Sequence, residues 1–369
     1  MSVQSSQKSP VVPSEELSRA ADVNPELRLG TIFFLSERDV AKSVTQENVT
    51  GAIEACFASL AANSAFNFPV VRKPLGYSDA IFGFKSGFDR RGPSLGIKAG
   101  GLWPGNKSRG LANHQSTIML FDPDSGAPAA LVCGTYLTAL RTASASALSV
   151  RYLARADAET LAITAAGGQA EYQLRACFAE RPFKRLLLPQ RPSKSGESLK
   201  DKLTDLDVEI EVLAMEDLCR QSDVLITVAL SFAPYVERTW VRPGTHIACM
   251  GTDTKGKQEL DPHLVADSTV FGDAPDQNAL LGECQHAVSL GLLNETQITP
   301  LGEVINGVHS GRATCDQITL FDSTGMGMQD LAAASLALAK AQKAGNFTTL
   351  SQQGDRSGDQ SRELRVDER

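Results

Sequence analysis

The sequence predicts an α/β protein of two domains, one with an antiparallel sheet and the other with a doubly wound parallel sheet. A chain of 369 residues is too long for one average domain and long enough for two. Its first half has short strand-like runs separated by Gly, Pro and Asn, which are typical of antiparallel sheets. Its second half alternates apolar runs with segments of helix length, which is the pattern of parallel sheets.

Several strands and an amphipathic helix are expected in the first half. They are a strand at Thr31–Leu35, an amphipathic helix over Val49–Leu60, and strands at Ala80–Lys85 and Ser116–Phe121. A long helix, Leu137–Ala154, should lead into the second half.

Six apolar runs follow this helix. They are Leu161–Thr164, Arg185–Leu188, Val208–Leu213, Val224–Ala229, His246–Gly251 and Val270–Phe271. Because helix-length segments separate them, they predict parallel strands joined by crossover helices. Ile318–Phe321 should be one more strand, and the alanine-rich segment Asp330–Ala341 a last helix.

Composition argues against several classes of protein. A net charge of −7 gives no basic surface for nucleic acid, and no apolar run reaches the ~18 residues of a membrane span. The start lacks the apolar core of a signal peptide, and the seven cysteines show neither Cys-x-x-Cys pairs nor zinc-site spacing. We therefore expect a cytoplasmic protein without a metal site, whose polar ends, residues 1–29 and 346–369, are disordered tails.

The segment Ala165–Ala170 has the layout of a dinucleotide-binding turn. Its sequence, Ala-Ala-Gly-Gly-Gln-Ala, follows the strand-like run Thr160–Thr164 and precedes the helix-like run Glu171–Phe178. Strand, glycine turn and helix in this order bring a pyrophosphate against free backbone N–H groups at a helix N-terminus. Taken alone, the match fits an ordinary buried turn between a strand and a helix equally well.

Three basic residues in apolar or glycine-rich surroundings are candidates for binding an anion. Lys98 lies between an apolar strand and two glycines, Arg141 lies in an apolar helix among small residues, and Arg72 follows two valines. A buried cation needs an anionic partner, either a protein carboxylate or a ligand. A guanidinium can hold a carboxylate by two parallel hydrogen bonds, which favours an amino-acid or keto-acid ligand. The alternative is that each residue is a solvated surface charge.

Asp253 and His114 are candidates for proton transfer. Asp253 follows the apolar strand His246–Cys249, and ligands bind at the carboxyl ends of strands in a doubly wound sheet. It could act as a general acid or base beside a cofactor, or simply form a turn. His114 could shuttle a proton, although a lone histidine before a strand is more often structural. No Gly-x-Ser-x-Gly context supports serine hydrolysis.

With these residues in view, the chain resembles the ornithine cyclodeaminase/μ-crystallin family from about Phe33 to Ala341. The resemblance rests on several motifs in the right order. They are Val71-Arg-Lys-Pro, Gly96-Ile-Lys, Pro104-Gly-Asn, Leu120-Phe-Asp-Pro-Asp-Ser-Gly, Leu137-Thr-Ala-Leu-Arg-Thr-Ala-Ser-Ala, Gly167-Gly-Gln-Ala, Gly251-Thr-Asp, Leu301-Gly-Glu-Val and Leu320-Phe-Asp-Ser-Thr-Gly.

The resemblance implies both a fold and a chemistry. A Rossmann domain, residues 141–315, would be inserted into an α+β antiparallel domain, residues 30–140 and 316–345, that binds substrate and forms a homodimer. NAD(H) or NADP(H) would bind in the cleft and exchange hydride with the α-carbon of a small imino or amino acid. Arg72, Lys98 and Arg141 would clamp the α-carboxylate, Lys98 and Asp253 would be catalytic, and Asp253 would transfer the proton.

The family pattern also implies the residues that bind the cofactor. They are Thr142, Ala166, Gly167, Gly168, Gln169, Ala170, Gln190, Arg191 and Ser323, with Asp322 and Thr324 also near the nicotinamide. Two features depart from that pattern. Ala165 replaces the first glycine of the turn, which would cost about 1 kcal/mol or more if its φ were positive. No acidic residue follows the second strand for the ribose 2′-hydroxyl. Gln190 could bind that hydroxyl, whereas Arg191 with Ser193 and Lys194 could bind a 2′-phosphate, so NADH and NADPH both stay open.

One position discriminates among family members. Ornithine cyclodeaminases carry a glutamate on the strand after the first carboxylate-binding arginine, where it meets the substrate's side-chain amine. This chain has Phe82-Gly-Phe-Lys85 there. Lys85, if strand register turns it inward, would prefer a second carboxylate. The runs Gly100–Asn106 and Gly110–Ser116 also resemble the imine-reductase members.

The favoured reaction is therefore the reduction of iminosuccinate to L-aspartate. The alternatives are ornithine cyclodeamination to proline and ammonia, and reduction of a cyclic ketimine such as pyrroline-2-carboxylate. A further alternative is a non-catalytic μ-crystallin-like binding protein, which the departures at Ala165 and Gln190 would favour.

Overall fold

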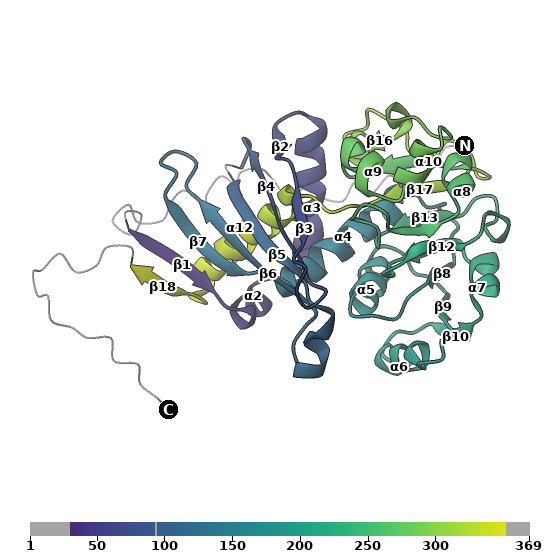
Figure 1. The fold of residues 1–369 in the computed structure, drawn as a ribbon, viewed down its shortest axis with the longest axis horizontal. Coiled ribbons are helices and arrows are strands. Elements are labelled where there is room, and N and C mark those ends of the chain that lie inside the picture. Colours follow the sequence, from purple (N-terminus) through teal and green to yellow (C-terminus); the bar gives the residue numbers. More distant parts are fainter. Residues whose placement is uncertain (1–29, 93, 352–369) are drawn as a thin grey trace, which may run out of the picture.

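The computed structural model describes residues 30–92 and 94–351. These residues form two large sheets with helices packed against them (Figure 1). One sheet is largely antiparallel and the other is parallel, so the predicted fold class is confirmed. The tail predicted at residues 1–29 lies outside the described residues, as does the tail beyond residue 351.

The first sheet has the strand order β18-β1-β7-β6-β5-β4-β2, with β3 paired to β4. Its neighbours are antiparallel except β1 and β7, which run parallel. Its strands are β1 (Thr31–Leu35), β2 (Ala65–Asn67), β3 (Val71–Pro74), β4 (Ile81–Asp89), β5 (Ser94–Leu102), β6 (His114–Phe121), β7 (Pro128–Cys133) and β18 (Thr348–Ser351). A short 3-10 helix, η3 (Pro104–Arg109), lies between β5 and β6.

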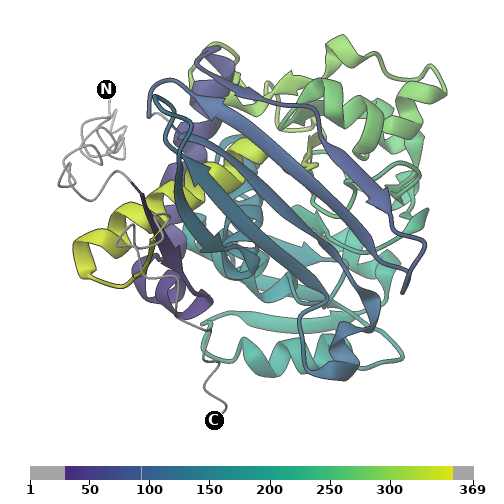
Figure 2. The same cartoon turned by 60° about the vertical axis from the view of Figure 1, so that its left-hand side comes forward.

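Helices cover one face of this sheet. The helix α12 (Gly327–Ala344) lies so close that a Cβ atom on Gly96 would come within 2.7 Å of Leu331, and one on Gly87 within 2.7 Å of Met328. Glycine at these strand positions lets the helix approach the backbone. The helices α2 (Glu37–Ser43) and α3 (Gln46–Ala61) pack beside α12. In Figure 2 the long strands of the sheet pass in front of α12.

The second sheet has the order β10-β9-β8-β11-β13-β17-β15-β16, and all its pairs are parallel. Its strands are β8 (Thr160–Ile163), β9 (Arg185–Pro189), β10 (Glu209–Leu213), β11 (Val224–Thr227), β13 (His246–Cys249), β15 (Thr269–Gly272), β16 (Thr299–Pro300) and β17 (Thr319–Asp322). Two short strands, β12 (Phe232–Val236) and β14 (Gln258–Leu260), pair separately.

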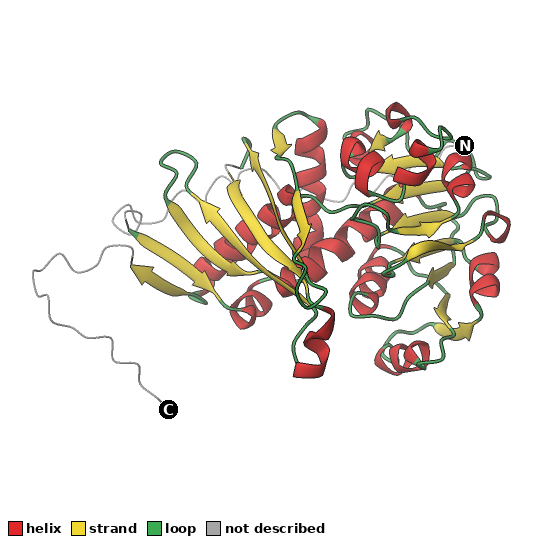
Figure 3. Cartoon of the chain, viewed as in Figure 1, coloured by secondary structure: helices red, strands yellow, loops and turns green. Residues whose placement is uncertain are grey.

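Helices lie on both faces of the second sheet (Figure 3). They are α5 (Ala170–Glu180), α6 (Ser195–Lys202), α7 (Met215–Gln221), α8 (Pro262–Asp267), α9 (Pro275–Leu281), α10 (Gln285–Ser289) and α11 (Leu301–Ile305), with 3-10 turns η4 (Arg238–Trp240) and η5 (Glu295–Gln297). This double cover explains why β8, β11, β13 and β17 are buried along their whole length. No helix in the described ranges is both long and apolar enough to cross a bilayer.

The direction of strand addition reverses between β8 and β11. From β8 the chain adds β9 and β10 on one side, and β11 and β13 then follow on the other. In doubly wound sheets, ligands bind in the crevice at such a switch point, beyond the carboxyl ends of the strands. The turn Ala165–Ala170 begins there, and α4 (Thr135–Leu153) connects the first sheet to this region.

The structure differs from the expected domain boundaries in two places. β17 pairs with β13 and β15, so the chain returns to the first sheet after Asp322 and not at residue 316. β18 pairs with β1 although the sequence predicted a tail from residue 346. All four residues of β18 are exposed, so no apolar alternation marks this edge strand in the sequence.

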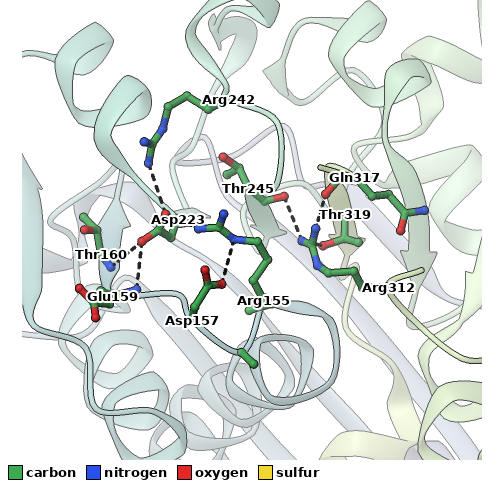
Figure 4. Close-up of polar contacts among 12 residues, drawn as sticks. Arg155, Asp157, Glu159, Thr160, Asp223, Arg242, Thr245, Arg312, Gln317 and Thr319 are labelled. Atoms are coloured by element: carbon green, nitrogen blue, oxygen red, sulfur yellow. Dashed lines mark hydrogen bonds and ion pairs between the residues drawn. The ribbon is translucent and has the colours of Figure 1, made fainter. Parts of the chain in front are cut away.

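Charged side chains join the amino ends of the parallel strands (Figure 4). Asp223, just before β11, accepts hydrogen bonds of 3.0 Å from the N–H groups of both Glu159 and Thr160. Arg155 donates to the same carboxylate at 2.8 Å. Nearby, Arg312 donates at 2.7 Å to the hydroxyl of Thr319 at the start of β17. These contacts tie the loop before β8 to its neighbouring strands.

Asp223→Ala is expected to lower the free energy of unfolding by about 2 kcal/mol, because two N–H groups and the guanidinium groups of Arg155 and Arg242 lose this acceptor. Asp157→Ala is the matched control, since Asp157 is 79% exposed and contacts Arg155 at 3.5 Å. The control should lose less than about 0.5 kcal/mol. Thermal unfolding of the two variants measures the difference, and equal melting temperatures would contradict the role given to Asp223.

Candidate active site

A cavity of about 170 Å³ lies between the two sheets. Strands β3 to β6 and helix α4 line one side, and the loops after β8, β13 and β17 line the other. These loops leave the carboxyl ends of parallel strands, where doubly wound folds bind ligands. The structure brings together here Arg72, Lys85, Lys98, Arg141, Thr142, Gln169, Asp253 and Ser323, all of which the sequence predicted for the site.

Lys85 and Lys98 are directly opposite each other on β4 and β5, so both side chains lie on the same face of the sheet. This register turns Lys85 into the cavity, where its Nζ donates to the carbonyl oxygens of Thr324 at 3.0 Å and Gly325 at 2.7 Å. Burial and the charge of Lys98 lower the pKa of Lys85 to about 7. Burial also lowers the pKa of Lys98 to about 8. Both amines therefore titrate near neutral pH.

A buried carboxylate, Asp330 of α12, holds two of the cations. Its oxygens lie 2.8 Å from Nζ of Lys98 and 3.0 Å from Nε of Arg141. Arg141 also donates to Gln329 at 3.1 Å. Although burial opposes ionisation, the charges of Arg141 and Lys98 hold the pKa of Asp330 below its usual range. The anionic partner that the sequence required for Lys98 and Arg141 is thus, in part, supplied by the protein.

Asp253 is ion-paired on two sides. Arg72 reaches one of its oxygens, and Nζ of Lys257 lies 2.7 Å from the other. Although burial opposes ionisation, the charges of Lys257, Arg72 and Lys85 hold the pKa of Asp253 well below its usual range. Asp253 is therefore a carboxylate at neutral pH in the free protein and can accept hydrogen bonds.

The cavity carries an excess of positive charge. Arg72, Lys85, Lys98 and Arg141 line it, and Asp253 is the acidic residue among its lining residues. Lys257 and Asp330 stand directly behind these groups. Such a site attracts a ligand with more than one negative charge.

His114 also lines the cavity. Burial and the charges of Lys98 and Arg141 lower the pKa of His114 to about 4, so the imidazole is neutral at physiological pH. At this pKa the neutral imidazole is a weak base. If His114 shuttles a proton, as considered from the sequence, it must start from the neutral form. Among the described residues there is no cluster of His, Cys, Asp or Glu suited to a metal ion.

The predicted dinucleotide turn is shaped for close approach of a ligand. Cβ atoms on Gly167 or Gly168 would meet nothing within 4 Å, and no side chain caps the N-terminus of α5. The side-chain oxygen of Gln169 is buried without a hydrogen-bond partner. Ala165 is not among the described non-glycine residues with positive φ, so its methyl group adds no backbone strain. Open space and uncapped N–H groups fit a pyrophosphate. The unpaired oxygen of Gln169 can accept a hydrogen bond from a hydroxyl or amide group of the same cofactor.

The remaining predicted cofactor residues flank this turn. Ala166 is half-buried, Ala170 begins α5, and Thr142 follows Arg141 on α4. Gln190 is exposed after β9. Arg191 does not extend into solvent, because its Nη2 donates to the carbonyl oxygen of Thr164 at 3.0 Å. This contact places the guanidinium beside the carboxyl end of β8.

Three functional candidates were not found by sequence reasoning. Asp330 and Lys257 hold the cavity's charged groups, and Asp273 holds the loop that contains Ser323. An acidic residue in the first turn of an alanine-rich helix is the only sequence signal for Asp330, and helix N-termini commonly carry one.

Comparisons with known proteins support the family that the sequence motifs indicated. The model of the ornithine cyclodeaminase/mu-crystallin family matches residues 32–345. The chain belongs to this family. Its sequence is similar to iminosuccinate reductase from Paracoccus denitrificans, with 45% identity over 303 residues that cover 82% of this chain and 94% of that protein. The crystal structure of that reductase in complex with NAD+ has a TM-score of 0.83 at 43% identity, covering 87% of this chain and 99% of the other.

Two more distant family structures share the fold. The Δ1-pyrroline-2-carboxylate reductase of Thermococcus litoralis, in complex with NADH and L-proline, has a TM-score of 0.82 at 29% identity, covering 86% of this chain and 99% of the other. An archaeal alanine dehydrogenase dimer with bound NAD has a TM-score of 0.83 at 28% identity, covering 87% of this chain and 99% of the other.

Proposed function

We propose that this protein is an NADH-dependent imine reductase that converts iminosuccinate to L-aspartate. The observation that carries the proposal is the cavity lined by four cations, in which Lys85 of β4 and Lys98 of β5 lie side by side. Iminosuccinate has two carboxylates, and a site with this excess of positive charge suits it. The 45% identity with an iminosuccinate reductase supports the same reaction.

Arg72, Lys98 and Arg141 are assigned to the α-carboxylate of the substrate. Asp330 fixes Lys98 and Arg141 at 2.8 and 3.0 Å, so these cations need little reorganisation when the ligand binds. Arg72 can exchange its contact with Asp253 for one with the substrate, because Lys257 still neutralises Asp253. Held in this way, the imine carbon keeps a fixed orientation for hydride transfer.

Lys85 is assigned to the second carboxylate. Two of the three N–H groups of its ammonium bind carbonyl oxygens, which leaves one for the cavity. A carboxylate beside it would raise its pKa above about 7 and keep it charged. An ammonium at this position repels the side-chain amine of ornithine, which disfavours ornithine cyclodeamination.

Asp253 is assigned to the imine nitrogen. As a carboxylate, it would stabilise the protonated imine, which accepts hydride more readily than the neutral imine. When bound, the reduced nicotinamide supplies the hydride to the α-carbon, and the C=N electron pair becomes the lone pair of the new amine. The reaction also needs the proton that the imine nitrogen carries. Lys98 lines the cavity and has a pKa of about 8, so it is assigned to supply this proton.

The cofactor is assigned to the turn between β8 and α5. Gly167, Gly168 and the first N–H groups of α5 would hold the pyrophosphate, and Gln169, Thr142 and Ser323 line the cavity toward the nicotinamide end. Gln190 is assigned to the ribose hydroxyl. We favour NADH because Arg191 is already bound to the carbonyl of Thr164, whereas NADPH would require it to turn outward.

A homodimer is also part of this proposal. Ile97, Met119, Leu131 and Phe34 are partners in register across β5, β6, β7 and β1. They alternate with residues that face α12, so this apolar row lies on the face opposite that helix. A second copy of the chain would cover it, as the dimeric archaeal relative suggests. Light scattering should give the mass of two chains, and Met119→Asp should give the mass of one.

The test of function is an assay with oxaloacetate and ammonia, which form iminosuccinate in solution. We expect NADH to be oxidised and L-aspartate to accumulate. Oxidation only with Δ1-pyrroline-2-carboxylate would instead indicate a cyclic ketimine reductase, and proline formed from ornithine with catalytic NAD+ a cyclodeaminase. A melting temperature raised by NADH without turnover of any of these substrates would indicate a non-catalytic binding protein.

Lys85→Met is expected to lower kcat/KM for iminosuccinate by about 30-fold, because the second carboxylate loses its cation. The monocarboxylate 2-iminopropionate, formed from pyruvate and ammonia, lacks that group and should change less than about threefold. Lys73→Met, on the exposed side of β3, is the control and should change neither rate. Steady-state kinetics with both imines measures the selectivity, and an equal loss for both would contradict the assignment.

A further inference from the structure

The segment Ser323–Gly325, here called the 323–325 loop, forms one wall of the cavity between β17 and α12. Asp273, just after β15, holds this loop. Its carboxylate accepts hydrogen bonds from the hydroxyls of Ser323 and Thr324, each at 3.0 Å, and from the N–H of Gly325 at 2.7 Å. Asn278 donates to it at 3.1 Å. Asp273 is buried and does not itself line the cavity.

The opposite side of the same loop holds Lys85. Both hydrogen bonds of the Lys85 ammonium within the described residues go to carbonyls of this loop. Gln277 also donates to the Thr324 hydroxyl at 2.6 Å and to the Gly325 carbonyl at 3.2 Å. Gly325 has φ of +71°, and a Cβ atom on it would come within 2.6 Å of Arg141. The position of the loop therefore sets the position of Lys85, whereas Asp330 and Gln329 hold Arg141.

We propose that Asp273 is a positioning residue for substrate specificity, which fixes Lys85 through the 323–325 loop so that the site selects a dicarboxylic imine. The inference rests on the proposed function of the cavity and adds a residue that never touches substrate. Among the described residues, Lys85 is held by two neutral carbonyls and by no carboxylate, so its placement depends on the loop's backbone. Asp273 supplies the charge that orders that backbone from behind.

A carboxylate is required at this position because each of its oxygens accepts two hydrogen bonds. An asparagine has the same shape but only one acceptor oxygen. On either side, its NH₂ group would face one hydroxyl, which can turn to accept a hydrogen bond, and one N–H group, which cannot. The contact to that N–H group would be lost. The substitution Asp273→Asn therefore releases the loop without opening a cavity in the core.

The test compares Asp273→Asn with Asp276→Asn, which changes an exposed aspartate three positions along the chain. For Asp273→Asn we expect kcat/KM for iminosuccinate to fall about 30-fold, while kcat/KM for 2-iminopropionate changes less than about threefold. The control should leave both values unchanged. The double variant Asp273→Asn, Lys85→Met should be no worse than Lys85→Met alone, because both changes remove the same contact.

Two kinetic results would overturn the inference. One is an equal fall for both imines, which a general structural role produces. The other is multiplied losses in the double variant. If the wild-type protein reduces neither imine, the proposed function fails, and calorimetry with succinate and propionate decides the inference separately. Asp273→Asn should then weaken succinate binding about 30-fold and leave propionate binding unchanged; equal changes for the two acids would refute the positioning role.

Discussion

Arg141→Met is expected to lower kcat/KM for iminosuccinate roughly 150-fold, which corresponds to a loss of about 3 kcal/mol in transition-state binding. Arg141 is buried on α4, and its guanidinium is held by Asp330 and Gln329. Methionine keeps most of the apolar length but removes the fork that can bind a carboxylate by two hydrogen bonds. Arg141→Lys keeps the charge and loses the fork, so its loss should be intermediate.

The matched control for this prediction is Arg151→Met, nearly three turns further along the same helix. Arg151 is ion-paired with Glu54 and Glu180 and does not line the cavity. It should lower the melting temperature without changing kcat/KM. The affinity for NADH, measured by fluorescence titration, should be unchanged in both variants. An Arg141→Met protein that keeps wild-type kcat/KM would remove Arg141 from the site.

The cations of the site could be predicted from sequence because their surroundings are conspicuous. Lys98 stands in an apolar strand next to glycines, and Arg141 in a helix of small residues, where a charge needs a partner. Their protein partner could not be predicted in the same way. Asp330 lies 189 positions from Arg141, and only the packing of α12 against α4 and β5 brings the two together.

Lys85 shows how far strand periodicity carries a prediction. Its chemistry was evident from the chain, but its direction depended on the register between β4 and β5. A shift of one residue would have turned it to the face opposite α12. The pairing of Lys85 with Lys98 is a property of the folded sheet, and no local signal in either strand specifies it.

The predicted domain boundaries differ from those in the structure for a related reason. β17 enters the parallel sheet between β13 and β15, so the last strand to be added in sequence lies inside the sheet and not at its edge. β18 is a polar edge strand whose backbone pairs with β1, and its side chains carry no burial pattern. Both are long-range pairings, which depend on the arrangement of strands formed earlier in the chain.

A substitution in the turn after β8 is expected to weaken cofactor binding without changing the stability of the free protein. Gly167→Val is expected to weaken NADH binding by at least ~100-fold, since the proposed cofactor site brings the pyrophosphate against the backbone of this glycine. The free protein should be unaffected. A Cβ atom on Gly167 meets nothing within 4 Å, and its φ lies outside the range that only glycine favours. The added side chain therefore projects into space that the ligand needs and that no protein atom fills.

Differential scanning fluorimetry of the free and NADH-loaded proteins measures both quantities. Wild-type protein at NADH concentrations near 100 times Kd should gain about 2.7 kcal/mol of stability, and Gly167→Val should gain almost none. Gly105→Val is the control, because Gly105 also has open space around a Cβ atom but lies in η3, between two strands of the first sheet. It should keep the NADH-induced stabilisation. If Gly167→Val retains it as well, the pyrophosphate does not lie on this turn, and the N-terminus of α5 must be given another role.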